Sequence, residues 1–126
     1  MLLKNFNVTT KRKISSFNKV IKVDTDKSMS IRSFLIGAIS HNISSATNVL
    51  ESEDVLATIN CLKKLGVKIT RRKSGSYLIF GKGLGSLNAK KGIKLNFGNS
   101  GTLARLLIGI LSTTPNIEVE LRGDHS

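Results

Sequence analysis

The sequence predicts an α/β fold, because segments with helical apolar spacing alternate with short strand-like segments along the whole chain. Residues 32–40 (RSFLIGAIS) also resemble residues 105–112 (RLLIGILS), and each stretch follows a strand-like segment and a loop of small hydroxylated residues. This match indicates a repeated strand–helix–strand–helix–strand–strand unit, with one full copy and part of a second. The alternative is that two helices rich in Leu, Ile and Gly are alike by chance.

The first copy begins near residue 20. Residues 20–23 (VIKV) alternate as a strand does, and the polar loop 24–30 follows. Apolar residues at i, i+3 and i+4 predict a helix over 31–39, with Ser28 or Ser30 as its N-cap. Upstream of this copy the pattern is weak, and it supports only a poorly defined strand at residues 2–8.

The clearest helix covers residues 53–65 and follows a short strand expected at 45–50. Ser52 is placed to cap its N-terminus, and Gly66 is placed to end it. One apolar stripe runs along this helix: Val55, Leu56, Ile59, Leu62 and Leu65. After it we expect hairpin strands at 67–70 and 76–80, a strand at 93–97, a helix at 103–112, a strand at 117–121 and a final loop.

Composition restricts the class of protein. With 126 residues and 40% hydrophobic residues, the chain is long enough for one compact domain. The 20 Lys and Arg residues against 8 Asp and Glu give a formal charge of +12, which favours anionic partners such as phosphorylated metabolites, nucleic acid or acidic membrane surfaces. The plainer alternative is a basic, solvated surface.

Cys61 is the only cysteine, so no internal disulfide forms and a reducing compartment fits. The N-terminus lacks the apolar region of a signal peptide, and no apolar run approaches the ~18 residues of a membrane span. We therefore expect a soluble, cytoplasmic protein without membrane contacts. The two histidines and Cys61 form no metal-ligand pattern, and no metal site is expected.

Two loops carry the chemical signal. In the first, Lys27, Ser28 and Arg32 surround the expected start of a helix, where unpaired N–H groups and the helix dipole favour anions. Taken alone, this loop also fits an ordinary serine-capped helix with exposed basic residues.

The second loop is Gly98-Asn-Ser-Gly-Thr102, and Arg105 follows one turn later. Its glycines let the backbone approach a ligand, while Asn99 and Thr102 supply hydrogen-bond donors. It lacks the lysine of a Walker A loop and the glycine spacing of a dinucleotide fingerprint. On its own it is a weak signal for an anion site.

In this order the motifs Asp26-Lys-Ser-Met-Ser-Ile-Arg32, Ser52-Glu-Asp-Val55 and Gly98-Asn-Ser-Gly-Thr102 resemble those of the enolpyruvylshikimate-phosphate synthase family. The resemblance implies an enolpyruvyl transferase fold, an inside-out α/β barrel of repeated βαβαββ units. It also implies that residues 20–126 are part of one substrate-binding domain and that residues 1–19 join the opposite domain.

The resemblance further implies an enzyme that transfers the carboxyvinyl group of phosphoenolpyruvate to 3-phosphoshikimate in aromatic amino-acid biosynthesis, without a cofactor. Lys27 would contact both substrates, and Ser28 and Arg32 would hold 3-phosphoshikimate. Gly101 would lie against phosphoenolpyruvate with Asn99 and Thr102 beside it, and Arg105 would support the loop.

Some features depart from the family pattern. Asp24-Thr25 replaces the usual Pro-Gly, and Ile31 replaces a polar residue at the helix start. The family's acid/base carboxylates and C-terminal basic residues have no counterpart, so we expect no catalytic residue in this chain and no turnover by the chain alone.

The alternative from another class is a small basic nucleic-acid-binding module. The basic runs 11–13 (KRK) and 71–73 (RRK) favour it, together with the net charge. The shortage of aromatic residues for base stacking counts against it.

Overall fold

The computed structural model describes residues 9, 11, 18, 20 and 23–125. The strand predicted at 2–8 lies outside the described residues. Of the strand predicted at 20–23, only Val20 and Val23 are described, and both are exposed coil.

Helices and strands alternate along the described residues, as the sequence predicts. The elements are α1 (Lys27–Ile39), β1 (Ile43–Ala46), α2 (Glu53–Lys64), β2 (Lys68–Arg71), β3 (Tyr77–Phe80), β4 (Lys94–Asn96), α3 (Gly101–Ser112) and β5 (Glu120–Arg122). The α/β class is confirmed.

The strands form two sheets. In the first, of order β1-β3-β2, both pairings are antiparallel, and the predicted hairpin is the β2–β3 pair with Ile69 opposite Ile79. In the second, β4 and β5 pair in parallel with Leu95 opposite Leu121. A parallel pair needs a crossover, and α3 supplies it.

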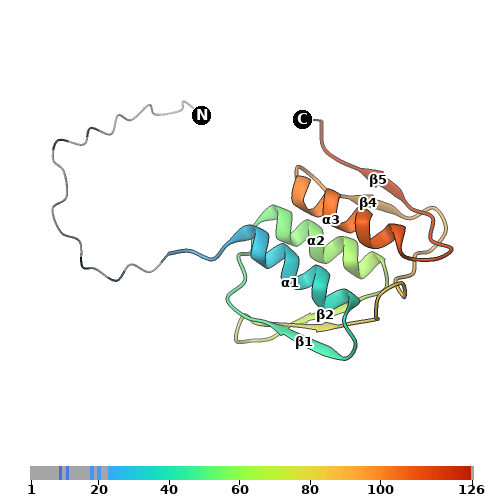
Figure 1. The fold of residues 1–126 in the computed structure, drawn as a ribbon, viewed down its shortest axis with the longest axis horizontal. Coiled ribbons are helices and arrows are strands. Elements are labelled where there is room, and N and C mark those ends of the chain that lie inside the picture. The colour runs from blue at the N-terminus through green and yellow to red at the C-terminus, as the bar shows by residue number, and fades with distance from the viewer. Residues whose placement is uncertain (1–8, 10, 12–17, 19, 21–22, 126) are drawn as a thin grey trace.

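The helices lie together on one side of the β1-β3-β2 sheet (Figure 1). Helix α1 packs against β1 and β3 and also contacts α2 and α3, while α2 contacts β2 and β4. All three helices run in the same direction, so their N-termini lie at one end of the molecule (Figure 1). One continuous apolar core joins these elements, and its residues on the helices include Ile31, Phe34, Leu35, Val55, Ile59, Leu62, Leu103, Leu107 and Leu111.

The start of α1 corrects the predicted cap. The helix begins at Lys27, and its N-cap is Asp26, whose carboxylate accepts a hydrogen bond of 2.6 Å from the Met29 N–H. Neither Ser28 nor Ser30 is the cap, because both lie inside the first turn. A carboxylate is a good cap since it satisfies a free N–H group and also complements the helix dipole.

Two strand predictions are displaced. The strand predicted at 45–50 is β1 at Ile43–Ala46, because Asn48 takes a positive φ of 55° and turns the chain away from the sheet. The strand predicted at 117–121 is β5 at Glu120–Arg122, since Glu120 begins the ladder by donating its N–H to the Ile93 carbonyl.

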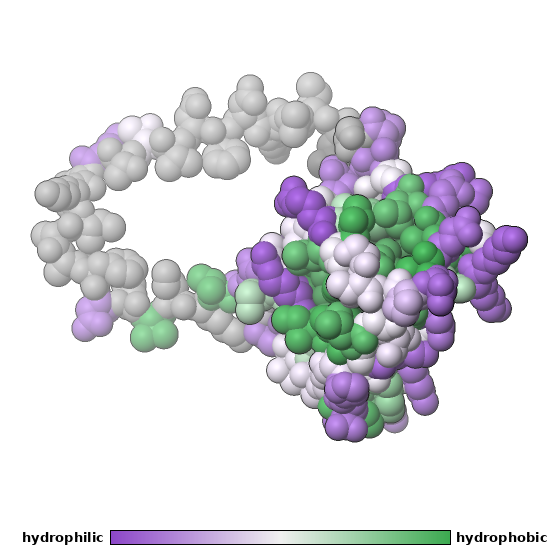
Figure 2. Space-filling model, turned by 45° about the vertical axis from the view of Figure 1, so that its right-hand side comes forward, coloured by the Kyte–Doolittle hydropathy of each residue, from purple (hydrophilic) through white to green (hydrophobic). Residues whose placement is uncertain are grey.

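Apolar side chains also reach the surface, and Figure 2 shows green patches between the purple polar side chains of one face. The large apolar side chains that remain exposed on α1 and α3 are Met29, Ile36, Leu106 and Ile108. The fold therefore leaves part of the apolar surface of both helices uncovered in this chain.

Candidate functional site

The start of α1 presents free backbone donors. Asp26 accepts from Met29 through its side chain and from the Ser30 N–H through its carbonyl at 3.1 Å. The N–H groups of Lys27 and Ser28 have no hydrogen bond among the described residues. Helix starts of this kind bind anions because unpaired N–H groups and the positive end of the dipole point outward.

Lys27 is engaged across the helix layer. Its ammonium lies 2.7 Å from a carboxylate oxygen of Asp54 in the first turn of α2, and about half of the lysine side chain is exposed. The Asp54 side chain is only 18% exposed, but water reaches the ammonium and screens the pair, so its contribution to stability is on the order of 1 kcal/mol. Its effect is therefore mainly to restrict where the ammonium lies.

Ser28 and Arg32 lie on one side of α1, because a spacing of four residues brings side chains together on a helix. Ser28 is half-buried and Arg32 is exposed. Arg32 makes no ion pair or hydrogen bond with the described residues. Gly37, which packs against Ile79 of the sheet, lies about 140° around the helix axis from Arg32. Arg32 therefore points away from the sheet and is available to an anion.

Two side chains, one before the second loop and one within it, fix its backbone. Asn96 accepts the Gly98 N–H at 2.9 Å, and Gly98 takes a positive φ of 54°, which glycine adopts without strain. Ser100 is the N-cap of α3, and its hydroxyl accepts the Leu103 N–H at 3.3 Å. Thr102, in the first turn, has no partner for its N–H among the described residues. Asn99 and Gly101 are exposed beside it.

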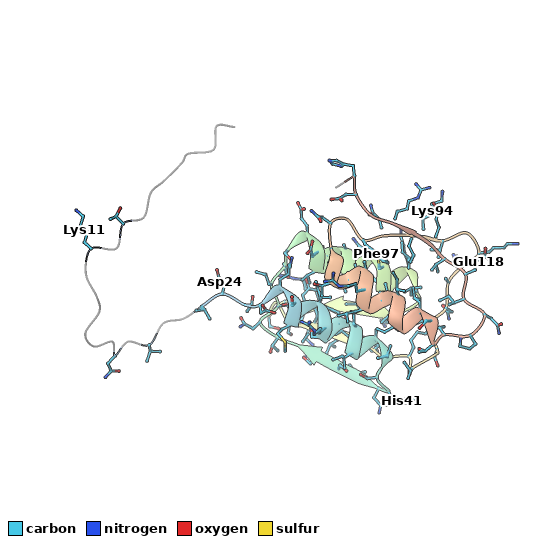
Figure 3. The ribbon with its side chains drawn as sticks, turned by 45° about the horizontal axis from the view of Figure 1, so that its top comes forward. Lys11, Asp24, His41, Lys94, Phe97 and Glu118 are labelled. Carbon is cyan, nitrogen blue, oxygen red and sulfur yellow. The ribbon has the colours of Figure 1, made fainter. Side chains whose placement is uncertain are left out.

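A hollow of about 340 Å³ lies beside this loop, between the start of α3 and the end of β5. The two sides are tied by backbone hydrogen bonds, from Phe97 N–H to the Arg122 carbonyl at 2.8 Å and from Asp124 N–H to the Gly98 carbonyl at 3.1 Å. Phe97, labelled in Figure 3, directly follows β4 and is buried. The lining of the hollow includes Asn99, Gly101 and Arg122.

Arg105 lies one turn after Gly101 on the exposed side of α3. Its guanidinium is close to Gly101, since a methyl group at that glycine would lie 3.6 Å from Nη1. Arg105 makes no ion pair among the described residues. The absence of a side chain at Gly101 therefore leaves a cationic group beside an open stretch of backbone.

The two loops lie at the same end of the molecule. The starts of α1 and α3 are together at this end, and the two helices pack against each other (Figure 1). The hollow beside Asn99 is lined by the second loop, by Ala104 and Ile108 of α3 and by the end of β5 with the residues after it, and Lys27, Ser28 and Arg32 are not part of this lining. Within residues 23–125 the structure thus brings the two helix starts to one end without joining them in a single cavity.

Sequence reasoning missed two residues. The pairing of Lys27 with Asp54, which belongs to the motif at residues 52–55, was not predicted. Arg122 was assigned to the final loop, and it ends β5 and lines the hollow. Helical spacing from Ser52 could have placed Asp54 in the first turn of α2, but not opposite Lys27.

The described residues contain no group of three His, Cys, Asp or Glu side chains that could hold a metal ion. In the described part of the chain, no helix is long and apolar enough to cross a bilayer.

Comparison with protein families identifies the chain. The family model for EPSP synthase (3-phosphoshikimate 1-carboxyvinyltransferase) matches residues 11–126. The chain belongs to the EPSP synthase family. The resemblance inferred from the two loops and the α2 start is therefore confirmed.

Individual relatives support the same family assignment. The 3-phosphoshikimate 1-carboxyvinyltransferase of Paramagnetospirillum magneticum is 44% identical over 93 residues, which cover 74% of this chain and 21% of the relative. That of Thermoanaerobacter sp. strain X514 is 47% identical over 107 residues, covering 85% and 24%. The chain thus spans about a quarter of the length of the relatives it matches.

Solved structures confirm the fold. The EPSP synthase of Acinetobacter baumannii is 40% identical, with a TM-score of 0.75 over 84% of this chain and 24% of that one. The enolpyruvyl transferase type of α/β fold, predicted from the resemblance, is therefore correct. None of these comparisons supports the nucleic-acid-binding alternative.

Proposed function

We propose that this chain supplies part of the substrate site of a 3-phosphoshikimate 1-carboxyvinyltransferase. The complete reaction transfers the carboxyvinyl group of phosphoenolpyruvate to a hydroxyl of 3-phosphoshikimate and releases phosphate. The observation that carries the proposal is the placement of two helix starts with free N–H groups and unpaired arginines at one end of the fold.

In this proposal the start of α1 binds 3-phosphoshikimate. The Ser28 hydroxyl and its free N–H donate hydrogen bonds, and the Arg32 guanidinium forms a planar, paired contact with an anionic group. Lys27 contacts both substrates, because its ammonium lies at the N-terminal edge of the helix layer and is held there by Asp54.

The start of α3 binds phosphoenolpyruvate. Gly101 lets the ligand approach the backbone, and Asn99 and Thr102 donate hydrogen bonds from either side of it. Arg105 supports the site by its charge. Holding two anionic substrates close together requires that their mutual repulsion be offset, and these cationic and N–H groups do so.

We propose that the described residues contribute binding groups and no general acid or base. Lys27 is paired with Asp54, and Asp26 is occupied as a helix cap. We therefore propose that the chain binds 3-phosphoshikimate weakly and does not turn over alone. We further propose that residues 20–126 are part of one substrate domain, that residues 1–19 join the opposite domain and that the protein is cytoplasmic.

Calorimetric titration of the chain with 3-phosphoshikimate tests the binding. Arg32→Ala should weaken it by about tenfold, since a charge-assisted hydrogen bond contributes roughly 1.5 kcal/mol or more. Arg72→Ala is the matched control, because Arg72 is exposed and belongs to the β2–β3 turn, outside the two loops that carry the proposed site. Equal losses in both variants would show only non-specific attraction by net charge.

Turnover is tested separately. A coupled phosphate-release assay with both substrates should give no signal above background for the isolated chain. Measurable turnover would contradict the proposal that the chain contributes only binding groups.

A further inference from the structure

Glu51, in the segment that precedes α2, is the acceptor of a small polar cluster. One of its oxygens, Oε1, accepts hydrogen bonds of 2.7 Å both from the Tyr77 hydroxyl and from Arg71 Nε. These two bonds lower the pKa of Glu51, with the tyrosine contributing most. Arg71 and Tyr77 are register partners at one end of the β2–β3 ladder, so the carboxylate is fastened to the sheet.

Glu51 matters because the start of α2 lacks a side-chain cap. Ser52 occupies the N-cap position, but its hydroxyl makes no cap hydrogen bond and is buried without a hydrogen-bond partner among the described residues. Only its backbone carbonyl takes part, accepting the Leu56 N–H at 2.9 Å. An uncapped first turn frays more readily than a capped one. In α2 that turn carries Asp54, the partner of Lys27.

The same segment is also fastened to the start of α1. The Ser30 hydroxyl, which is buried, accepts the Leu50 N–H at 3.1 Å and donates to the Asp26 carbonyl at 2.9 Å. Residues 50 and 51 are therefore held from two sides, by α1 through Ser30 and by the sheet through Glu51. Asp54 follows three residues later.

We propose that Glu51 and Tyr77 are positioning residues for Lys27. Their hydrogen bond takes the place of the missing cap, keeps the first turn of α2 formed and so holds the Asp54 carboxylate 2.7 Å from the Lys27 ammonium. Neither residue touches a substrate in this scheme. The proposal rests on the proposed function, in which Lys27 contacts both substrates.

The variant Tyr77→Phe isolates the hydrogen bond. It removes one hydroxyl and keeps the ring, whose edge-to-face contact with Phe34 has a centroid distance of 5.2 Å. Competitive acetylation read by mass spectrometry then reports the Lys27 side chain directly, since a lysine nitrogen held against a carboxylate is less accessible to the reagent than an unpaired one. We expect the acetylation rate of Lys27 to rise about fivefold in this variant, the effect of losing one hydrogen bond to a charged group near the surface.

Two comparisons separate positioning from general stability. Asp54→Asn should raise the Lys27 rate as well, and adding Tyr77→Phe to it should raise the rate no further, because both changes act on one contact. Lys73, in the exposed β2–β3 turn, should react equally in every variant. The amide exchange of Leu107, which is buried in α3, should also stay unchanged. An unchanged Lys27 rate in Tyr77→Phe, or additive effects in the double variant, would overturn the proposal.

Binding of 3-phosphoshikimate gives the functional readout. Tyr77→Phe should weaken binding about fivefold in the wild-type background and not at all in the Asp54→Asn background. Ser74→Ala is the matched control, since it removes a hydroxyl from the same hairpin, and among the described residues that hydroxyl is hydrogen-bonded only to Ser76. If the wild-type chain fails to bind 3-phosphoshikimate, the proposed function fails, while the acetylation result still decides whether Tyr77 positions Lys27.

Discussion

Ser30→Ala should destabilise the chain more than its small change in volume suggests. The Ser30 side chain is 6% exposed, and its hydroxyl joins α1 to the segment before α2 through two hydrogen bonds. The donor bond to the Asp26 carbonyl is redundant, because that carbonyl also accepts the Ser30 N–H. The acceptor bond is not, since the Leu50 N–H has no other partner among the described residues.

The expected magnitude follows from that difference. Leaving a partly buried N–H without an acceptor costs about 1–3 kcal/mol. Leu50 is only half-buried, so water replaces part of the lost bond and we expect about 1–1.5 kcal/mol. For a domain of this size, such a loss lowers the thermal midpoint by about 3–8 °C.

Urea denaturation followed by circular dichroism measures the change in the free energy of unfolding. Ser33→Ala is the matched control, because among the described residues its hydroxyl donates only to the Ser30 carbonyl in the same helix, at 2.8 Å. That change removes a local bond and leaves no N–H unsatisfied, so its effect should stay within about 0.5 kcal/mol. Equal destabilisation by the two variants would refute the reasoning that Ser30 links the two segments.

Three further predictions concern backbone space, thiol reactivity and pH. Gly81→Ala should lower the free energy of unfolding by about 2 kcal/mol or more, because its methyl group would meet backbone carbonyl oxygens at the end of α1. Gly109→Ala has open space around it and should raise the free energy of unfolding by about 0.5–1 kcal/mol. Thermal denaturation measures both changes. Burial raises the pKa of Cys61 to about 11, so its reaction with a disulfide reagent at pH 8 should be slow and should accelerate with urea in step with unfolding; fast labelling of the native chain would contradict this. The pKa of Glu51 is lowered from 4.5 by its bonds to Tyr77 and Arg71, so its contribution to stability is present above pH 4.5 and is lost as the pH falls through the folded value. The urea midpoint of Glu51→Gln should therefore depend less on pH between 3 and 6 than that of the wild type, and parallel curves would show that Glu51 does not contribute.

The sequence predicted helices better than strands, for a physical reason. α2 carries a long apolar stripe with acids at its start and Gly66 at its end, and the predicted helix at 53–65 matches Glu53–Lys64 to one residue. The ends of strands β1 and β5 were displaced by one to four residues, because short strands end where a partner or a turn ends them. The positive φ of Asn48 and the pairing of Glu120 with Ile93 are tertiary features that apolar alternation does not contain.

The two loops of the candidate site were predictable from the sequence, and the contacts between residues distant in sequence were not. Both loops lie at helix starts, as the spacing of small and basic residues indicated. The pairing of Lys27 with Asp54 was not visible, because the two residues are distant in sequence and meet only through the packing of α1 on α2. For the same reason Arg122 was not predicted as part of the hollow beside Asn99.

We propose that the starts of α1 and α3 form one anion-binding end of the molecule. Amide NMR spectra of the labelled chain, recorded during a titration with 3-phosphoshikimate and phosphoenolpyruvate, test it most directly. If the two helix starts bind their ligands side by side, the Ser28 and Thr102 amide signals shift together, and each ligand tightens the affinity for the other. Shifts confined to the basic β2–β3 turn, with Ser28 and Thr102 unmoved, would contradict it.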